Sequence, residues 1–185
     1  MDVTIIANRY AKALFNLAQE KNLIEPTYLD MIQVWEVVRE NKSLTNILRS
    51  PIIPNPKKLS ILRALFVGRI SAFTFRFLEL VIKKDRALLT RYIAESFIEI
   101  YKDHKNIITI QLVTAYTLDE LTRRKILDQL SDLTHMTIDL VEKVNPELIG
   151  GFVFSYKDRK FDASLRQKIK LLSKEFEKNP YVKEL

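Results

Sequence analysis

Two histidines, His104 and His135, are the residues of this sequence best suited to acid–base catalysis or metal binding. They stand about thirty residues apart, and neither lies in a motif that would bring a nucleophile or a second ligand beside it. The carboxylates are scattered singly over polar faces, without the spacing of metal ligands. The chain has no cysteine, which excludes thiol chemistry, disulfides and cysteine–zinc sites. We therefore expect no catalytic residue, no metal site and no enzymatic activity.

A pair of adjacent glycines, Gly150 and Gly151, could also serve chemistry, because glycine-rich loops bind phosphate groups. A phosphate loop needs more glycines and a helix directly after them. Here the alternating run 152–156 predicts a strand, so we expect no nucleotide or other cofactor. Since the chain has only three glycines, we expect this pair where backbone segments pass close together or bend.

Positive charge is concentrated in the stretch 49–91, within a chain whose formal net charge is +7. Ten Lys and Arg residues there, among them Lys57, Lys58, Lys83 and Lys84, stand against two acidic residues. Such a surface can meet nucleic acid, anionic lipid or an acidic protein, or can simply be solvated. One hypothesis is therefore a helical nucleic-acid-binding module that uses the basic stretch 49–91. Its binding would weaken steeply with salt and would need exposed aromatic residues among the cations. The phenylalanines instead have core-like helical spacing.

The elements that carry these residues are of two kinds. Apolar residues recur with a helical period in segments that span about 4–22, 26–41, 43–49, 55–67, 71–84 and 87–105. After residue 105, alternation predicts strands at about 108–113, 136–142 and 152–156, followed by a polar turn at 157–160. The predicted fold is mainly α: a six-helix N-terminal bundle, 1–105, followed by a small α/β C-terminal domain, 106–185.

Two further helices are predicted in the C-terminal part. A capping box of Thr117 and Glu120 opens a helix of about sixteen residues. Asp162 or Ser164 caps the last helix, whose apolar stripe is Leu165, Ile169, Leu172 and Phe176. We expect this helix and the segment 149–154 to belong to the core rather than to a contact surface.

Membrane insertion and export are not expected. The longest apolar runs are far shorter than the roughly 20 residues that span a bilayer. The N-terminus begins with a helical pattern and lacks a signal-peptide core or a transit segment. We expect a folded protein that stays where it is synthesised.

Two N-terminal helices have more apolar surface than one core contact requires. The apolar residues of the first predicted helix cover an arc of about 200°, whereas an ordinary surface helix needs a stripe nearer 100°. The helix at 71–84 has Phe73, Phe77 and Leu80 on one side, and on the opposite side it has Phe75, Leu78 and Ile82. Either both helices are central in their bundle, or one face of each packs inward while the other forms a groove for a partner helix.

Three motifs, in this order, resemble those of the ATP synthase δ subunit family, whose mitochondrial counterpart is the oligomycin-sensitivity-conferring protein. Residues 7–15 read ANRYAKALF, residues 145–152 read NPELIGGF, and residues 162–165 read DASL. Asn145 stands where the family usually has aspartate; both residues cap turns well. The resemblance spans essentially the whole chain.

The resemblance implies a non-catalytic stator subunit of F-type ATP synthase, which links the catalytic head to the peripheral stalk and so supports proton-driven ATP synthesis. It implies that the N-terminal domain receives the amphipathic N-terminal helix of an α subunit, and that the C-terminal domain engages the b subunits of the stalk. It also implies a peripheral location at the cytoplasmic face of the bacterial plasma (inner) membrane, with membrane association only through the complex and with no nucleic-acid partner.

The resemblance further implies that the first and fifth helices form the groove for the α-subunit helix. The residues expected to line it are Tyr10, Leu14, Leu17, Phe73, Phe77 and Leu80. The sequence leaves open which face of the fifth helix is outward, so Phe75 and Leu78 are the alternative lining residues.

Overall fold

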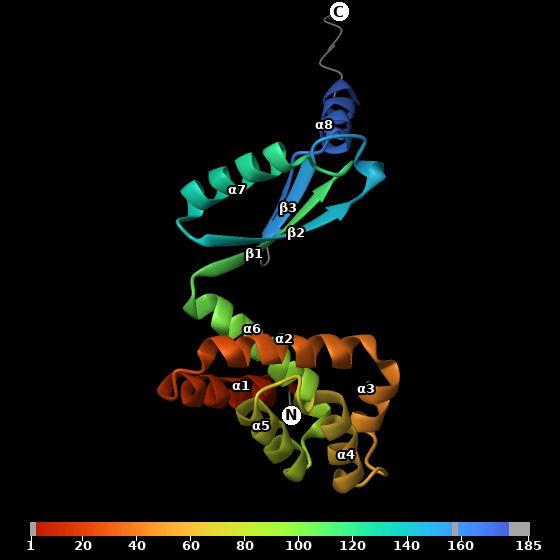
Figure 1. Ribbon diagram of the computed structural model, residues 1–185. Helices are drawn as coiled ribbons and strands as arrows, with labels where there is room; N and C mark the ends of the chain where they lie inside the picture. Colours follow the sequence, from red (N-terminus) through yellow and green to blue (C-terminus); the bar gives the residue numbers. More distant parts are fainter. Residues whose placement is uncertain (1–2, 157–158, 178–185) are drawn as a thin grey trace, which may run out of the picture. The chain divides into compact units, whose positions relative to one another are not determined.

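The computed structural model describes residues 3–156 and 159–177 (Figure 1). The described part is mainly helical with a small C-terminal sheet, which confirms the predicted fold class at that level. The chain divides into two compact units, Met1–His104 and Lys105–Leu185.

The first unit consists of helices and short connections. Its elements are α1 (Val3–Glu20), α2 (Ile24–Glu40), α3 (Lys42–Arg49), α4 (Asn55–Phe66), α5 (Ala72–Lys83), the 3-10 turn η1 (Ala87–Leu89) and α6 (Thr90–His104). Several connections contain a residue with positive φ of a type that tolerates it: Asn22 at 55°, Gly68 at 80° and Asp85 at 57°. The single helix predicted over 87–105 is thus a 3-10 turn followed by α6.

The core of the first unit lies around α6, which packs against α1 and α2. Alanines on the inner face of α1, such as Ala7 and Ala11, are fully buried and let α1 and α6 approach each other closely. Phe15 of α1 fills the space further along, with its ring centroid 5.9 Å from that of Phe97 on α6. This packing holds the face of α1 that carries Ala7, Ala11 and Phe15 against the core of the first unit.

The second unit is a four-stranded sheet with helices. Its elements are β1 (Ile107–Thr114), α7 (Glu120–Thr134), β2 (Thr137–Val144), the 3-10 turn η2 (Pro146–Leu148), β3 (Phe152–Tyr156), β4 (Arg159–Asp162) and α8 (Leu165–Glu177). The strand order is β2-β1-β3-β4. β1 and β2 are parallel and are joined through α7, while β3 is antiparallel to both β1 and β4. Ile108, Ile110 and Leu112 point from β1 into the core.

The structure corrects two local predictions in this unit. The helix after β1 begins at Glu120, and its N-cap is Asp119, whose carboxylate accepts from the Thr122 amide, so the Thr117–Glu120 capping box is wrong. The predicted polar turn at 157–160 is also wrong at its second half, because Arg159 and Lys160 belong to β4. Lys157 and Asp158 lie outside the described residues. Of the two candidate caps for α8, Ser164 accepts from the Gln167 amide.

The glycine pair marks a close approach of two backbone segments, as predicted. Gly151 has φ of 75°, and a Cβ atom there would lie 2.4 Å from the carbonyl oxygen of Ala163. The Leu165 amide donates to the Gly150 carbonyl at 2.9 Å, so the start of α8 runs directly against the pair. Only glycine meets both requirements at position 151.

Candidate partner-binding surface

The outer face of α1 carries an apolar stripe with helical spacing. Ile6 and Tyr10 are half-buried, and Ala13 and Leu17 are exposed, so these four residues form one face about three turns long. Leu17 is 41% exposed. Leu14 was expected to join this face, but it is 1% exposed and packs in the core, and this expectation is therefore corrected. It points inward because it lies on the same face as the buried Ala7 and Ala11.

The structure identifies the outward face of α5. Leu78 and Ile82 are buried, and together with Thr74 and Val81 they form the inner face. Phe73 and Phe77 are half-buried, and Leu80 is 49% exposed, so these three residues face outward. Phe75 is half-buried under the guanidinium of Arg63, whose carbon lies 6.0 Å from the ring centroid. Of the alternative lining pair, Leu78 is therefore buried in the core and Phe75 lies beneath Arg63, so neither offers an open surface to a partner helix.

The two outward stripes are carried on a common support. α2 packs against both α1 and α5, and α6 holds α1 and α2 together. The outward face of α1 (Ile6, Tyr10, Ala13 and Leu17) and that of α5 (Phe73, Phe77 and Leu80) are called below the α1 stripe and the α5 stripe.

A buried carboxylate fixes the start of α5. Asp30 of α2 accepts three hydrogen bonds through Oδ2: from the Ser71 amide at 3.1 Å, the Ser71 hydroxyl at 2.6 Å and the Thr74 hydroxyl at 2.6 Å. The Ser71 hydroxyl oxygen in turn accepts from the Thr74 amide, as an N-cap does. This network joins α2 to the first turn of α5 and so positions the α5 stripe.

Replacement of Asp30 by alanine is expected to destabilise the first unit by about 3 kcal/mol, because three donors lose a charged, buried acceptor. Urea denaturation monitored by fluorescence of Trp35, the only tryptophan, measures the change. Asp103→Ala on the exposed surface of α6 is the control and should stay within about 0.5 kcal/mol of the parent. Equal effects of the two substitutions would refute this role of Asp30.

A second polar contact joins α2 to the end of α6. The Tyr101 hydroxyl donates to the carboxylate of Glu25, and the Tyr101 ring stacks on Tyr28 with centroids 3.7 Å apart. Burial, followed by the hydrogen bond and negative charge of Glu25, raises the pKa of Tyr101 from 10.0 to about 12. The folded state therefore holds the phenolic proton more tightly than the unfolded chain does.

This pKa shift predicts an alkaline loss of stability. The contribution of Tyr101 is complete below pH 10 and is lost as the pH rises from 10 towards 12, at up to about 1.4 kcal/mol per pH unit. The free energy of unfolding of the parent should thus fall more steeply in this range than that of Tyr101→Phe. Tyr92→Phe, which removes an exposed hydroxyl from the same helix, should keep the parental slope. Parallel slopes for the parent and Tyr101→Phe would contradict the prediction.

The basic stretch 49–91 does not form a uniform cationic surface. Lys58 is buried, and its ammonium group donates to the Leu48 carbonyl at 3.1 Å. Arg63 pairs with Glu79 at 2.5 Å while it covers Phe75. Lys58 and Arg63 are therefore engaged within the fold, and the aromatic ring beneath Arg63 is not open for stacking with a base.

The C-terminal unit also exposes apolar side chains, contrary to expectation. Leu165, Ile169 and Leu172 of α8 are about half exposed, so the predicted core role of this stripe is wrong in the isolated chain. The side chain of Phe176 lies outside the described residues. Ile149 is also exposed, whereas Val153 is buried, so the expectation for 149–154 holds only in part. Figure 1 shows that α7 lies along one face of the sheet, whereas α8 extends from its end.

The sheet also exposes an aromatic row. Phe154 of β3 stacks on Phe161 of β4, with centroids 5.0 Å apart, and on Phe152 at 6.4 Å. Phe152 and Phe161 are exposed. The row and the α8 stripe (Leu165, Ile169 and Leu172) together leave more apolar surface uncovered than scattered single residues would.

Within the described residues, no group of three His, Asp or Glu side chains is arranged to hold a metal ion. His104, the last residue of α6, is exposed, and its ring is T-shaped to that of Phe15 with centroids 5.2 Å apart. His135 is the C-cap of α7, with a φ of 54°. The same part of the chain contains no helix both long and apolar enough to cross a bilayer.

The chain is similar along most of its length to known proteins of one family. Residues 6–176 match the family model "ATP synthase delta (OSCP) subunit". The chain is 30% identical over 176 residues to the ATP synthase subunit delta of Cytophaga hutchinsonii, covering 95% of this chain and 96% of that protein. It is 36% identical over 171 residues to the subunit delta of Lawsonia intracellularis, covering 91% of each chain. Its fold is similar to a chain in the Toxoplasma gondii mitochondrial ATP synthase hexamer, with a TM-score of 0.71, 20% identity, and coverage of 94% of this chain and 98% of that one.

Proposed function

This chain belongs to the ATP synthase delta (OSCP) subunit family, and from that premise we propose which of its surfaces perform the linking role. Its function is that of a non-catalytic stator component, which links the catalytic head of F-type ATP synthase to the peripheral stalk. The nucleic-acid-binding hypothesis has no support from the family or from the engaged cations of the basic stretch.

We propose that the six-helix domain, residues 1–105, binds the catalytic head by receiving the N-terminal helix of an α subunit along the α1 and α5 stripes. The observation that carries this proposal is that both helices turn apolar residues outward at helical spacing while their inner faces are fully packed. Covering about 500 Å² of apolar surface would contribute on the order of 12 kcal/mol before the costs of association. Such a contact can remain intact while the rotor turns.

The small α/β domain, residues 106–185, would bind the b subunits of the peripheral stalk through the α8 stripe and the aromatic row. A helix whose apolar face is left about half exposed by the described residues of its unit is suited to pack against another helix. The protein would be peripheral, held at the cytoplasmic face of the bacterial plasma membrane only through the complex.

The stalk proposal is tested by charge insertion on α8. Ile169→Asp should weaken binding of the purified b subunits by at least about 100-fold, because a carboxylate would be buried in an apolar contact. The affinity is measured as binding of each variant to b subunits immobilised on a surface. Lys168→Asp on the same helix is the control and should reduce binding by less than about tenfold. Unchanged affinity of a folded Ile169→Asp protein would remove α8 from the proposed interface.

A further inference from the structure

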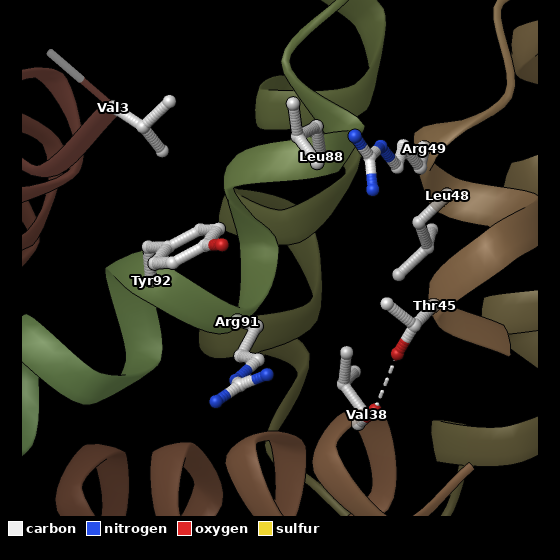
Figure 2. Close-up of a pocket in the computed structure, with 8 residues that line it drawn as sticks. All are labelled: Val3, Val38, Thr45, Leu48, Arg49, Leu88, Arg91 and Tyr92. Atoms are coloured by element: carbon white, nitrogen blue, oxygen red, sulfur yellow. Dashed lines mark hydrogen bonds between the residues drawn. The ribbon is translucent and has the colours of Figure 1, made fainter. Parts of the chain in front are cut away.

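A hollow of about 220 Å³ in the first unit is lined by none of the residues assigned above (Figure 2). Figure 2 shows side chains that converge from the start of α1, the end of α2, α3, η1 and α6. The apolar part of the wall is Val3, Val38, Leu48 and Leu88. The charged part consists of Arg49 and Arg91.

Neither arginine forms an ion pair with a described residue, although the Arg91 guanidinium carbon lies 5.9 Å from the ring centroid of Tyr92, which also lines the hollow. Elsewhere in the described chain Arg39, Arg63 and Arg123 each pair with a glutamate, whereas no such pair forms at Arg49 or Arg91. The Nε–H group of Arg91 is buried and has no acceptor. A buried donor without an acceptor is unfavourable, and an anionic group at the Arg91 side of the hollow would relieve it. Figure 2 shows the Arg49 guanidinium at the other end of the same hollow, beside Leu88.

The other residues that line the hollow indicate which kind of anionic group would fit it. The Thr45 hydroxyl already donates to the Val38 carbonyl at 2.7 Å, as the dashed line in Figure 2 marks. The donors that remain for a ligand include the planar guanidinium groups, which suit carboxylate and phosphate oxygens. A free phosphate is polar all round and would leave the four aliphatic side chains uncovered. A carboxylate on an aliphatic stem would satisfy both parts of the wall.

The hollow is smaller than the sites of drug-sized ligands, which measure about 300–1,000 Å³, and its volume suits a single acidic side chain. We infer that this pocket, called here the arginine pocket, binds a glutamate or aspartate side chain, with its apolar neighbours, from a protein partner. The arginine pocket shares no residue with the α1 stripe, the α5 stripe or the α8 stripe. A negative result for the pocket would therefore leave those assignments standing, and a negative result for them would leave the pocket standing.

The test uses the full chain and a small probe. Acetyl-Leu-Glu-Leu-amide is titrated while the side-chain Nε–H signals of arginine and the methyl signals of leucine are followed by NMR, and acetyl-Leu-Gln-Leu-amide is the neutral match. We expect the glutamate peptide to shift the signals of Arg91, Arg49 and Leu88 and to bind at least tenfold more tightly than the glutamine peptide. Arg91→Gln and Arg49→Gln should each lower the affinity at least fivefold, whereas Arg69→Gln, an exposed position outside the pocket, should leave it unchanged.

Three outcomes would overturn the inference. Equal binding of the two peptides would show that the carboxylate is not recognised. Shifts that persist in folded Arg91→Gln and Arg49→Gln proteins would place the peptide elsewhere. Inorganic phosphate that produces the same shifts at the same concentrations would mean a general anion site rather than a site for an acidic side chain.

Discussion

Replacing Phe77 with aspartate is expected to abolish binding of the α-subunit N-terminal helix, with a loss of at least about 100-fold, or about 2.7 kcal/mol. Phe77 stands at the middle of the α5 stripe, between Phe73 and Leu80. A carboxylate at this position would have to lose its water without gaining a counter-charge when the partner helix covers the stripe. Calorimetric titration with a peptide of the α-subunit N-terminus measures the loss.

Two matched variants separate binding from folding. Phe77→Leu keeps an apolar side chain in the stripe and should stay within about tenfold of the parental affinity. Ala72→Asp adds the same charge to an exposed position of α5 outside the stripe and should also retain binding. If the folded Phe77→Asp protein binds as tightly as Ala72→Asp does, the outward face of α5 is not the contact.

Replacing Gly151 with alanine is expected to destabilise the C-terminal unit by about 3 kcal/mol or more. The added Cβ would lie 2.4 Å from the Ala163 carbonyl oxygen, an atom of the backbone that cannot rotate away, at a φ of 75°. The connection between β4 and α8 would have to shift, and with it the α8 stripe. Amide NMR signals of β1 and β3, followed through urea denaturation, report this unit separately from Trp35 in the first unit.

The other two glycines provide the controls. Gly68 has nearly the same conformation, with φ of 80°, but no atom within 4 Å of its added Cβ, so Gly68→Ala should cost only about 1 kcal/mol. At Gly150 the added Cβ meets the movable side chain of Leu165 at 2.6 Å, and the cost of Gly150→Ala should be intermediate. A Gly151→Ala protein as stable as Gly68→Ala would show that the close backbone approach does not constrain the fold.

Local signals in the sequence were strong enough to predict much of this fold. The alternation of Ile108, Ile110 and Leu112 predicted the central strand β1, whose register with both neighbours the structure gives. The glycine pair predicted a close approach without revealing its partner, since Ala163 and Leu165 come from a later segment. Helical period predicted α5 almost to the residue, because Ser71 caps it and Lys84 ends it.

Periodicity could not decide what covers an apolar face. The α8 stripe has the spacing of a core helix, yet it stays about half exposed among the described residues of its own unit. This depends on where the sheet ends rather than on the stripe itself. Similarly, Leu14 and Ala13 lie within one wide apolar arc of α1, and only the packing of α6 shows that Leu14 is inside while Ala13 is outside. The outward face of α5 was undetermined for the same reason.

The arginine pocket could not be found from sequence either. Its two cations are more than forty positions apart and were grouped with the whole basic stretch, although Lys58 and Arg63 of that stretch are engaged elsewhere. The strand β4 was missed because Arg159 and Lys160 resemble a polar turn, while its pairing with β3 depends on backbone hydrogen bonds that carry no sequence signal.

The measurement that tests the linking role most directly is calorimetric titration of the purified chain with a peptide of the cognate α-subunit N-terminus, beside a short duplex RNA. We predict sub-micromolar binding of the peptide with a negative heat-capacity change, since apolar stripes are buried, and RNA binding that disappears at physiological salt. No heat with the peptide, together with tight RNA binding that survives physiological salt, would contradict the assignment of α1 and α5 as the site that holds the catalytic head.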